Sequence, residues 1–312
     1  MPDLGRTTPD PGARTPDAGT TTADAGATTS DPGGTTADPG GTTVVTRFRG
    51  VTVEFRCPDP ADTAHLRYYL SDHLLTDGSP AELAVRLETA DGGSFTRALG
   101  TATTKRVWWR TPTGPWRLYE QWDTHARLPS PVPPFGLPPL RDRLRLRHGA
   151  ALAAPDGSAR TLAVTGDSGA GKSVILVHLL HQGWAFVSDD LLVMDRQDPG
   201  RLYYYGRPVG VRESNLRLLP WLDTTLLADA PCLPTRWGRT WMVRPQRLGR
   251  CAPVDRPLRL AWRLHLTRGA RLAVRTAGPT TYVTWDPHLH LEEVLAVCRR
   301  PRPDAEGDGH AA

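Results

Sequence analysis

The chain has 312 residues, of which 39% are hydrophobic, and a formal net charge of +5. That length allows one large domain or two ordinary domains, each with a buried core. No apolar run reaches the roughly 18 residues that a membrane span needs, and the N-terminus lacks an apolar stretch behind a basic flank. The sequence therefore predicts neither a membrane span nor a secretory signal, and a cytoplasmic location is expected.

Arginine carries nearly all of the positive charge, because Lys105 and Lys172 are the only lysines. Arginine in place of lysine is typical of a GC-rich genome, so the charge gives little support for a nucleic-acid partner, and none is expected. The four cysteines lie far apart, without a Cys-x-x-Cys pair: Cys57, Cys232, Cys251 and Cys298. This spacing favours reduced thiols over a zinc site or a disulfide framework.

Residues 1–43 repeat with a period of seven, in units such as TTADAGA, TTSDPGG and TTADPGG. No position of the repeat carries a large apolar residue, and proline or glycine recurs in most units. Such a segment cannot bury enough surface to offset its ordering entropy, so it is predicted to be a disordered arm. Its threonine-rich, acidic units suit a tether, a modification site or a solvated extension without a specific function.

Residues 44–127 are predicted to form a smaller N-terminal α+β module. The alternation in Val44–Arg56 predicts a strand, and the apolar spacing in Asp62–Leu75 predicts a helix. Four further short strands are expected at Leu83–Leu87, Ser94–Leu99, Arg106–Arg110 and Trp116–Trp122. Six prolines then crowd residues 128–140, which predicts a linker to the following domain.

Residues 141–300 are predicted to form an α/β core, followed by a disordered tail at 301–312. Leu144–Ala153 is expected to be one strand, and Thr161–Thr165 a buried strand that enters a glycine-rich loop. A helix is predicted at Lys172–Gln182 and a second buried strand at Trp184–Ser188. The later elements are a hairpin of Leu191–Met194 with Arg201–Tyr205, strands at Leu258–Leu266, Ala270–Arg275 and Thr281–Trp285, and a helix at His290–Cys298.

The glycine-rich loop fits G-x-x-x-x-G-K-[ST] at every position: Gly166, Asp167, Ser168, Gly169, Ala170, Gly171, Lys172 and Ser173. Its glycines allow successive backbone N–H groups to point at a β-phosphate, and the following helix adds its positive N-terminal end. In this motif the lysine reaches the β- and γ-phosphates and the hydroxyl completes a Mg²⁺ shell. The sequence therefore predicts a site for a nucleoside triphosphate.

Asp189 and Asp190 follow the second buried strand, which we expect to lie beside the P-loop strand. A carboxylate there is placed to hold Mg²⁺, and a second one to accept a proton from an attacking hydroxyl. Neighbouring residues of a strand point in opposite directions, so both face the site only if the strand ends or bends there. The other interpretation leaves one aspartate on the metal while its neighbour caps a turn.

The chain resembles the HPr kinase/phosphorylase family in the sequence GDSGAGKS, the eleven-residue helix after it and the following VSDD. His148-Gly149 is also similar to that family's His-Gly pair near the active site. The resemblance covers roughly residues 144–215. It implies an HPr-kinase-like P-loop kinase core in which Lys172 binds phosphate, Ser173 and Asp189 serve the metal, and Asp190 is the base. It further implies ATP and Mg²⁺ as cofactors, and it is compatible with a homo-oligomer.

The chain is more similar to divergent relatives that phosphorylate Ser or Thr on peptides, including ribosomally made, modified peptides. The expected activity is transfer of the γ-phosphate to a hydroxyl of a peptide, a protein or a small molecule. The alternative is an ATP-binding switch or scaffold protein without phosphotransfer. No lysine follows an asparagine, so the Asn-Lys-x-Asp motif of GTPases is absent.

Several residues near the motif have two interpretations each. Arg207 and Arg212 suit a clamp on the γ-phosphate or on an acidic acceptor, and equally a solvated surface. His148 suits a phosphate contact or a structural histidine. His178 and His181, on the predicted P-loop helix, are expected to be packing or surface residues.

Overall fold

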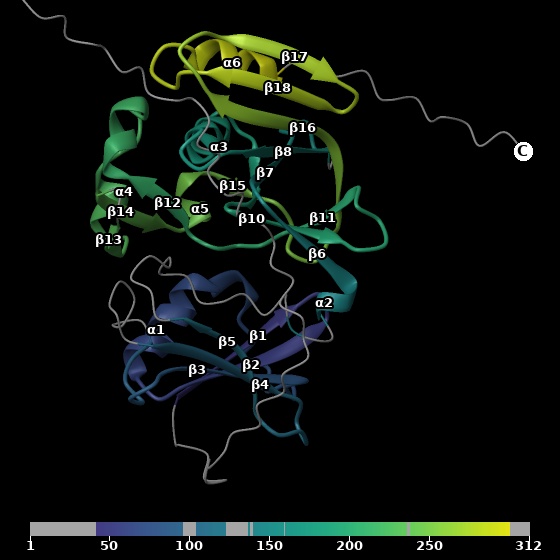
Figure 1. The fold of residues 1–312 in the computed structure, drawn as a ribbon, viewed down its shortest axis with the longest axis vertical. Helices are drawn as coiled ribbons and strands as arrows, with labels where there is room; N and C mark the ends of the chain where they lie inside the picture. Colours follow the sequence, from purple (N-terminus) through teal and green to yellow (C-terminus); the bar gives the residue numbers. More distant parts are fainter. Residues whose placement is uncertain are drawn as a thin grey trace, which may run out of the picture.

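The computed structural model of the chain describes residues 42–95, 104–122, 137, 140–158, 160–235 and 238–299. They form a mixed α/β structure with a five-stranded sheet at one end and a large curled sheet around helix α3 at the other (Figure 1). Of the arm expected at 1–43, residues 1–41 lie outside the described residues, as do the tail at 301–312 and most of the linker; Thr42 and Thr43 instead belong to the first strand. None of the described helices is long and apolar enough to cross a membrane.

The N-terminal sheet has the order β1-β2-β3-β4-β5. Its strands are β1 Thr42–Phe48, β2 Val51–Cys57, β3 Leu83–Thr89, β4 Lys105–Arg110 and β5 Arg117–Trp122. The single strand predicted over Val44–Arg56 is wrong, because Arg49 and Gly50 both have positive φ and close a hairpin. No strand forms at Ser94 and Phe95, and the rest of that predicted strand lies outside the described part.

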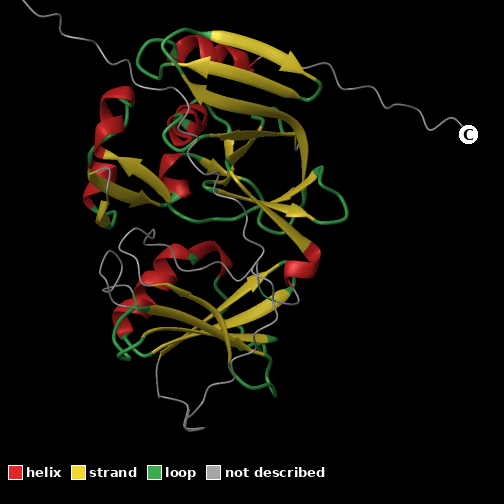
Figure 2. Cartoon of the chain, viewed as in Figure 1, coloured by secondary structure: helices red, strands yellow, loops and turns green. Residues whose placement is uncertain are grey.

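Helix α1 (Pro60–Tyr69) is shorter than the predicted helix and is followed by the 3₁₀ helix η1 (Ser71–His73). It begins where it does because Asp59 caps it, accepting a hydrogen bond from the Ala61 N–H at 2.7 Å, and Pro60 occupies the first turn. α1 lies on the face of the five-stranded sheet that is turned toward the large sheet (Figure 2).

The large sheet has the order β15-β9-β7-β8-β16-β11-β10-β6, and β18 and β17 continue it from β16. Its strands are β6 Leu144–His148, β7 Ala150–Ala153, β8 Arg160–Gly166, β9 Ala185–Ser188, β10 Leu191–Asp195, β11 Arg201–Tyr203, β15 Arg250–Cys251, β16 Leu258–Arg268, β17 Ala273–Ala277 and β18 Thr280–Trp285. The predicted hairpin is confirmed as β10 paired with β11, and the strand predicted at Thr281–Trp285 is confirmed as β18.

Two sequence-based expectations about this sheet are wrong. Leu144–Ala153 is not one strand, since the chain breaks at Gly149 and sends β6 to the sheet edge and β7 between β8 and β9. Gly149 allows this bend, because a Cβ there would stand 2.8 Å from the Val164 carbonyl oxygen. For the same reason β9 does not lie beside the P-loop strand β8: β7 separates them and pairs antiparallel with both.

The remaining elements cover α3 (Lys172–His181) and the sheet margins. α6 (Leu291–Arg299) contacts α3 on the side of β18, and α5 (Pro245–Leu248) contacts α3 and β15. A three-stranded sheet of the order β12-β14-β13, which the sequence did not predict, packs beside η3: β12 Val209–Arg212, β14 Gly238–Val243, β13 Cys232–Thr235, η3 Glu213–Leu218. Two short helices complete the structure, α2 (Leu140–Arg143) and α4 (Thr225–Ala228).

The two sheets share a hydrophobic cluster. Val193 and Tyr203 from the large sheet, and Tyr205 just after β11, pack with buried residues of the N-terminal sheet and α1. Polar contacts reinforce this junction: Tyr68 Oη donates to the Met242 carbonyl oxygen at 2.6 Å, and Gln246 Nε2 donates to Asp72 at 2.6 Å. The N-terminal sheet is therefore seated on the core through a packed interface.

His73 is the buried titratable group of this junction. Its Nε2 accepts a hydrogen bond from the Gly206 N–H at 3.2 Å, and its ring packs on Phe48 with centroids 4.6 Å apart. Burial outweighs the opposing effect of Asp72 and lowers the pKa of His73 to about 4. Protonation would remove the acceptor for Gly206 and place a charge in the cluster.

The free energy of unfolding should therefore fall in mild acid. Because the folded pKa of His73 lies below the unfolded value, its contribution is complete above pH 6.5 and disappears as the pH falls toward 4. Between pH 7.5 and pH 5 we expect a loss of roughly 2 kcal/mol from this group, measured by urea unfolding. His73→Gln keeps an acceptor but does not titrate, so the variant should lose less stability over the same interval. An equal loss in both proteins would assign the acid sensitivity to other groups.

Candidate nucleotide site

The P-loop connects the end of β8 at Gly166 to the start of α3 at Lys172. Its three glycines have φ values of 136°, 81° and 92° at Gly166, Gly169 and Gly171, a region that favours glycine. At Gly166 the space is also closed, since a Cβ would stand 2.0 Å from the Leu266 carbonyl oxygen on β16. The loop is thus folded tightly against the neighbouring strand. Between these glycines Asp167, Ser168 and Gly169 are exposed and Ala170 is buried.

Trp285, at the end of β18, supports the loop from below. Its indole Nε1 donates to the Ala170 carbonyl oxygen at 2.9 Å, and its side chain is fully buried. A Cβ on Gly171 would stand 2.6 Å from Trp285 Cζ2, so the ring and the loop are in close contact. Sequence analysis missed this residue, because nothing near Trp285 in the chain signals that β18 returns beneath the P-loop.

α3 offers an anion site at its N-terminus. Gly171 is the N-cap, and no side chain in the described part of the chain caps the helix by a hydrogen bond. The first N–H groups of a helix need acceptors, and phosphate oxygens are suitable ones. Lys172 Nζ donates to the carbonyl oxygens of Gly166 and Asp167, both at 2.9 Å, so its ammonium lies over the loop. Burial lowers the pKa of Lys172, while the charges of Asp190 and Asp189 oppose that effect.

Ser173 and Asp189 form the candidate metal position. Ser173 Oγ donates to Asp189 Oδ1 at 3.4 Å, which brings a hydroxyl and a carboxylate from the start of α3 and the end of β9 together. Oxygen donors of this kind suit Mg²⁺, which takes its other ligands from phosphate oxygens and water. Burial and the neighbouring charge of Asp190 raise the pKa of Asp189. Within the described residues no cluster of three His, Cys, Asp or Glu side chains offers another metal position.

Asp190 lies beyond the end of β9 in the left-handed conformation, with φ of 67°. Aspartate tolerates this conformation better than most residues, and the bend breaks the alternation that would otherwise point the two carboxylates apart. Both carboxylates accordingly act on the pKa of Lys172. The sequence left two arrangements of Asp189 and Asp190 open, and the structure has the one in which the chain bends at Asp190.

Two side chains fix the Asp190 carboxylate. Arg207 Nη1 donates to Oδ2 at 2.8 Å, and His148 Nδ1 lies 3.1 Å from Oδ1 and 2.9 Å from the Asp190 carbonyl oxygen. Both oxygens are acceptors, so the His148 proton is on Nδ1. Burial alone would raise the pKa of Asp190, but the hydrogen bond from His148 and the charge of Arg207 outweigh it and hold that pKa well below its usual range.

Arg207 connects this carboxylate to the N-terminal sheet and helix. It is buried, and its Nη2 donates to Tyr69 Oη on α1 at 3.3 Å. It reaches this place because the Tyr205 N–H donates to the Val187 carbonyl oxygen at 2.9 Å, which ties the segment after β11 to β9. The expectation of a solvated arginine is wrong at this position. Arg212 lies near enough to Lys172 for its charge to lower the pKa of that lysine.

The two histidines of α3 take no part in the site. His178 Nε2 is 2.7 Å from the Leu218 carbonyl oxygen, and the His181 ring stacks on Trp221 with centroids 3.9 Å apart. Their prediction as packing or surface residues is confirmed.

Comparison with known proteins does not assign the chain to a family. No family model matches the chain, and none of the curated proteins matches its sequence. Among solved structures, the HPr(Ser) kinase/phosphatase from Coxiella burnetii is similar over 50% of this chain and 96% of that chain, at 13% identity and a TM-score of 0.27. Since a TM-score this low carries no argument, the assignments below rest on the site residues.

Replacing Trp285 by phenylalanine should weaken nucleotide binding. The substitution keeps an aromatic ring under the P-loop but removes the donor to the Ala170 carbonyl oxygen, a hydrogen bond that contributes on the order of 1 kcal/mol. We expect an approximately five-fold rise in the Kd of Mg-ATP, measured by calorimetry. Trp262→Phe, in the core against Trp184, is the matched control and should leave the Kd unchanged. Equal effects of both substitutions would show a general loss of packing instead.

Proposed function

We propose that this chain is a Mg-ATP-dependent kinase with an HPr-kinase-like core, transferring the γ-phosphate to a hydroxyl of a peptide, a protein or a small molecule. The observation that carries the proposal is the pairing of the P-loop with two carboxylates. Ser173 lies 3.4 Å from Asp189, and the next carboxylate, Asp190, is held by His148 and Arg207. A P-loop that only binds nucleotide has no need of the second carboxylate.

Each site residue has a task in this reaction. The loop N–H groups and Lys172 bind the phosphates, and Ser173 and Asp189 would hold Mg²⁺. When bound, Mg²⁺ supplies positive charge to the phosphate oxygens. Asp190 receives the acceptor hydroxyl and takes its proton, while His148 and Arg207 keep the carboxylate oriented and ionised.

The low pKa of Asp190 is compatible with this role. A carboxylate with a lowered pKa is a weak base, but phosphoryl transfer passes through a loose transition state in which the nucleophile needs orientation more than early deprotonation. The carboxylate therefore acts chiefly as a fixed acceptor for the hydroxyl hydrogen bond. The proton is transferred late, when the new P–O bond has made the former hydroxyl strongly acidic.

One observation favours the alternative of an ATP-binding switch. Arg207 joins Asp190 to Tyr69, so a change at the nucleotide site can be transmitted to the N-terminal sheet. In that case nucleotide binds but no phosphate is transferred.

Substitution of the two central residues tests the proposal. The protein is incubated with γ-labelled ATP, Mg²⁺ and a panel of Ser- and Thr-containing peptides and small alcohols, and products are identified by intact mass. Lys172→Ala should abolish or nearly abolish nucleotide binding. Asp190→Asn should leave binding intact and slow transfer by about a hundred-fold or more.

Asp198→Asn, a carboxylate outside the site, is the control and should transfer phosphate at the normal rate. Normal transfer by Asp190→Asn would show that the base is assigned wrongly. Bound ATP without transfer to any acceptor would favour the switch.

The charge of Arg207 should set the acid limit of activity. Arg207 lowers the pKa of Asp190, so Arg207→Gln should raise that pKa and leave Asp190 protonated at pH values where the wild type is ionised. The acid limb of the pH–rate profile is expected to move upward by about one to three pH units. Arg207→Lys keeps the positive charge and should remain close to the wild type. An unshifted limb in Arg207→Gln would mean that the limb reports another group.

A further inference from the structure

The free edge of the large sheet ends at the candidate site. β6 is the last strand on its side of the sheet and pairs with β10 alone among the described strands. The Arg196 N–H donates to the Arg143 carbonyl oxygen at 2.9 Å and the Gly149 N–H to the Asp190 carbonyl oxygen at 3.3 Å, so the odd-numbered residues face β10. By the alternation of an antiparallel ladder, the N–H and C=O groups of Leu144, Leu146 and His148 point away from the sheet.

A peptide strand added to this edge would lie beside His148, the residue that contacts Asp190. The side chain of a residue paired with His148 lies on the same face of the sheet as the His148 ring, with Cβ atoms about 4.5–5.5 Å apart. That ring is in contact with the Asp190 carboxylate at 3.1 Å. Strand addition at an exposed edge is a common way of binding an extended peptide. The edge can therefore bring a hydroxyl side chain to the His148 ring, which contacts the Asp190 carboxylate.

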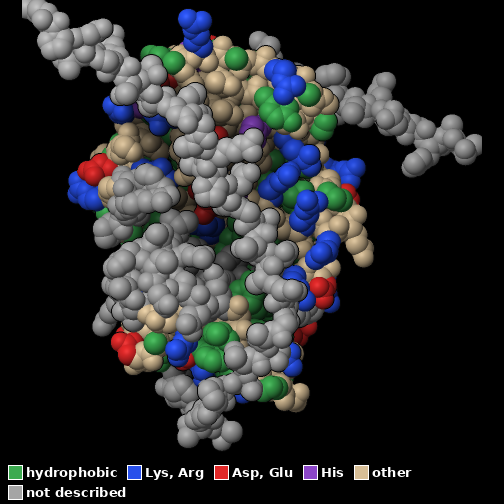
Figure 3. Space-filling view, viewed as in Figure 1, with side chains coloured by type: hydrophobic (Ala, Val, Ile, Leu, Met, Phe, Trp, Pro, Cys, Tyr) green, Lys and Arg blue, Asp and Glu red, His purple; other side chains and the backbone are tan. Residues whose placement is uncertain are grey.

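The surface of this edge is basic. Arg145 and Arg147 are exposed on β6 and have no ion-pair partner among the described residues. Figure 3 shows Lys and Arg side chains gathered on the side of the core where β6 and β11 lie. The edge thus suits an acidic peptide with a hydroxyl side chain.

The chain carries such a peptide at its own N-terminus. In residues 1–41 an aspartate recurs every seven residues, and a threonine stands two positions before five of the six: Thr8, Thr15, Thr22, Thr29 and Thr36. Six aspartates against two arginines give this segment a side-chain charge of −4, so the rest of the chain carries +9. The segment thus offers five hydroxyls and a net negative charge, which is opposite in sign to the charge of the edge.

The N-terminal segment is long enough for its threonines to reach the site from Thr42, where β1 begins. β1 begins at Thr42, whose Oγ1 lies 2.5 Å from Thr63 Oγ1 on α1, and α1 leads to Tyr69, which contacts Arg207 beside Asp190. This chain of contacts places Thr42 within roughly 30 Å of Asp190. Thr29 is 13 residues from Thr42 and can extend over about 45 Å, so it and the threonines before it have length to spare.

We propose that the acceptor hydroxyls of this site are the threonines of the Thr-x-Asp repeats in residues 1–41, presented to Asp190 along the free edge of β6. The inference rests on the proposed kinase function. In the reaction the threonine Oγ forms a bond to the γ-phosphorus of ATP and the bond from that phosphorus to the β–γ bridging oxygen breaks. The hydroxyl proton passes to the Asp190 carboxylate, and the products are ADP and a phosphothreonine.

The full-length chain is tested with γ-labelled ATP and Mg²⁺ and no added acceptor, with ADP formation and the site of label followed in parallel. Label on Thr8, Thr15, Thr22, Thr29 or Thr36 is expected, mapped by peptide mass. A variant with all five changed to valine should lose the label and still bind Mg-ATP with the wild-type Kd. Lys172→Ala should carry no label by itself and gain it when mixed with the valine variant, which supplies an intact site.

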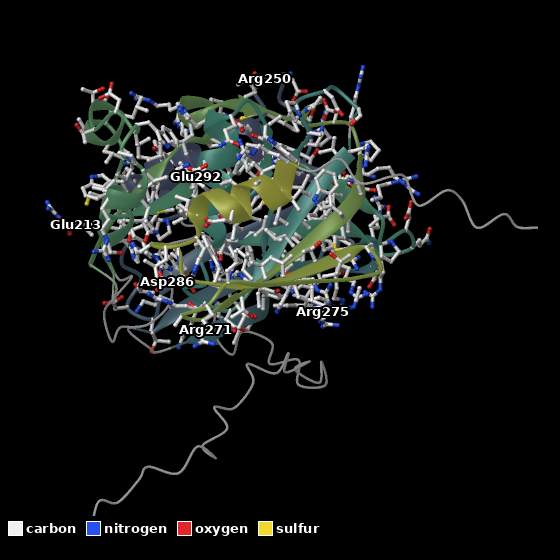
Figure 4. All side chains as sticks on the ribbon, turned by 90° about the horizontal axis from the view of Figure 1, so that it is seen from above. Glu213, Arg250, Arg271, Arg275, Asp286 and Glu292 are labelled. Carbon is white, nitrogen blue, oxygen red and sulfur yellow. The ribbon has the colours of Figure 1, made fainter. Side chains whose placement is uncertain are left out.

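The edge has its own test. Arg145→Glu with Arg147→Glu should lower the labelling rate about ten-fold, because two attractive charges become repulsive, without changing the Kd of Mg-ATP. Arg271→Glu is the matched control, since Arg271 is exposed at the end of the molecule that carries β17 (Figure 4) and should label at the wild-type rate.

The outcomes distinguish a failure of the kinase function from a failure of the proposed acceptor. Labelling of an acceptor from the panel described above, with residues 1–41 unlabelled, overturns this inference and leaves the kinase function standing. Bound Mg-ATP with no label on residues 1–41 and none on any acceptor of the panel overturns the kinase function and this inference together. Label on the repeat threonines with no effect of the β6 charge reversal overturns the edge as the docking surface.

Discussion

The partly buried, ionised carboxylate of Asp190 is the constraint on which the arrangement of this protein depends. A charge of this kind is costly to remove from water unless it is paired and hydrogen-bonded. Here the compensation comes from two places in the chain, His148 at the end of β6 and Arg207 after β11, and the bend at Asp190 turns the carboxylate toward them. The sheet edge, the segment beside β9 and the end of β9 must therefore meet at one point.

The same compensation joins the two sheets of the molecule. Arg207 is shared between Asp190 and Tyr69, while the neighbouring Gly206 N–H donates to His73 and Tyr204 Oη donates to Asp72. Three of the four residues after β11, Tyr204, Gly206 and Arg207, thus contact α1 or η1, and Arg207 also contacts the candidate site. An arginine held by both partners cannot move without disturbing either one. The N-terminal sheet is for this reason a structural component of the site.

The two aspartates occupy contrasting environments although they are neighbours. Asp189 is buried beside Ser173, where desolvation raises its pKa, whereas Asp190 has two cationic or hydrogen-bonding partners that lower its pKa. A pair of carboxylates whose pKa values are pushed apart is a common feature of sites that divide roles between two acids. In the proposed kinase this division assigns Asp189 to the metal and Asp190 to the acceptor.

The sequence by itself determined the P-loop, the helix that follows it and the hairpin of β10 with β11. These features are local, because glycine spacing, apolar periodicity and turn residues act over a few positions. The bent Asp189-Asp190 pair was one of two arrangements that the sequence left open. Only the tertiary structure decided that β7 lies between β8 and β9, that Trp285 supports Ala170, and that Arg207 is buried against Asp190 and Tyr69. Each of these contacts joins residues distant in the chain, and their partners are set by how the strands order themselves in the sheet, which no local pattern encodes.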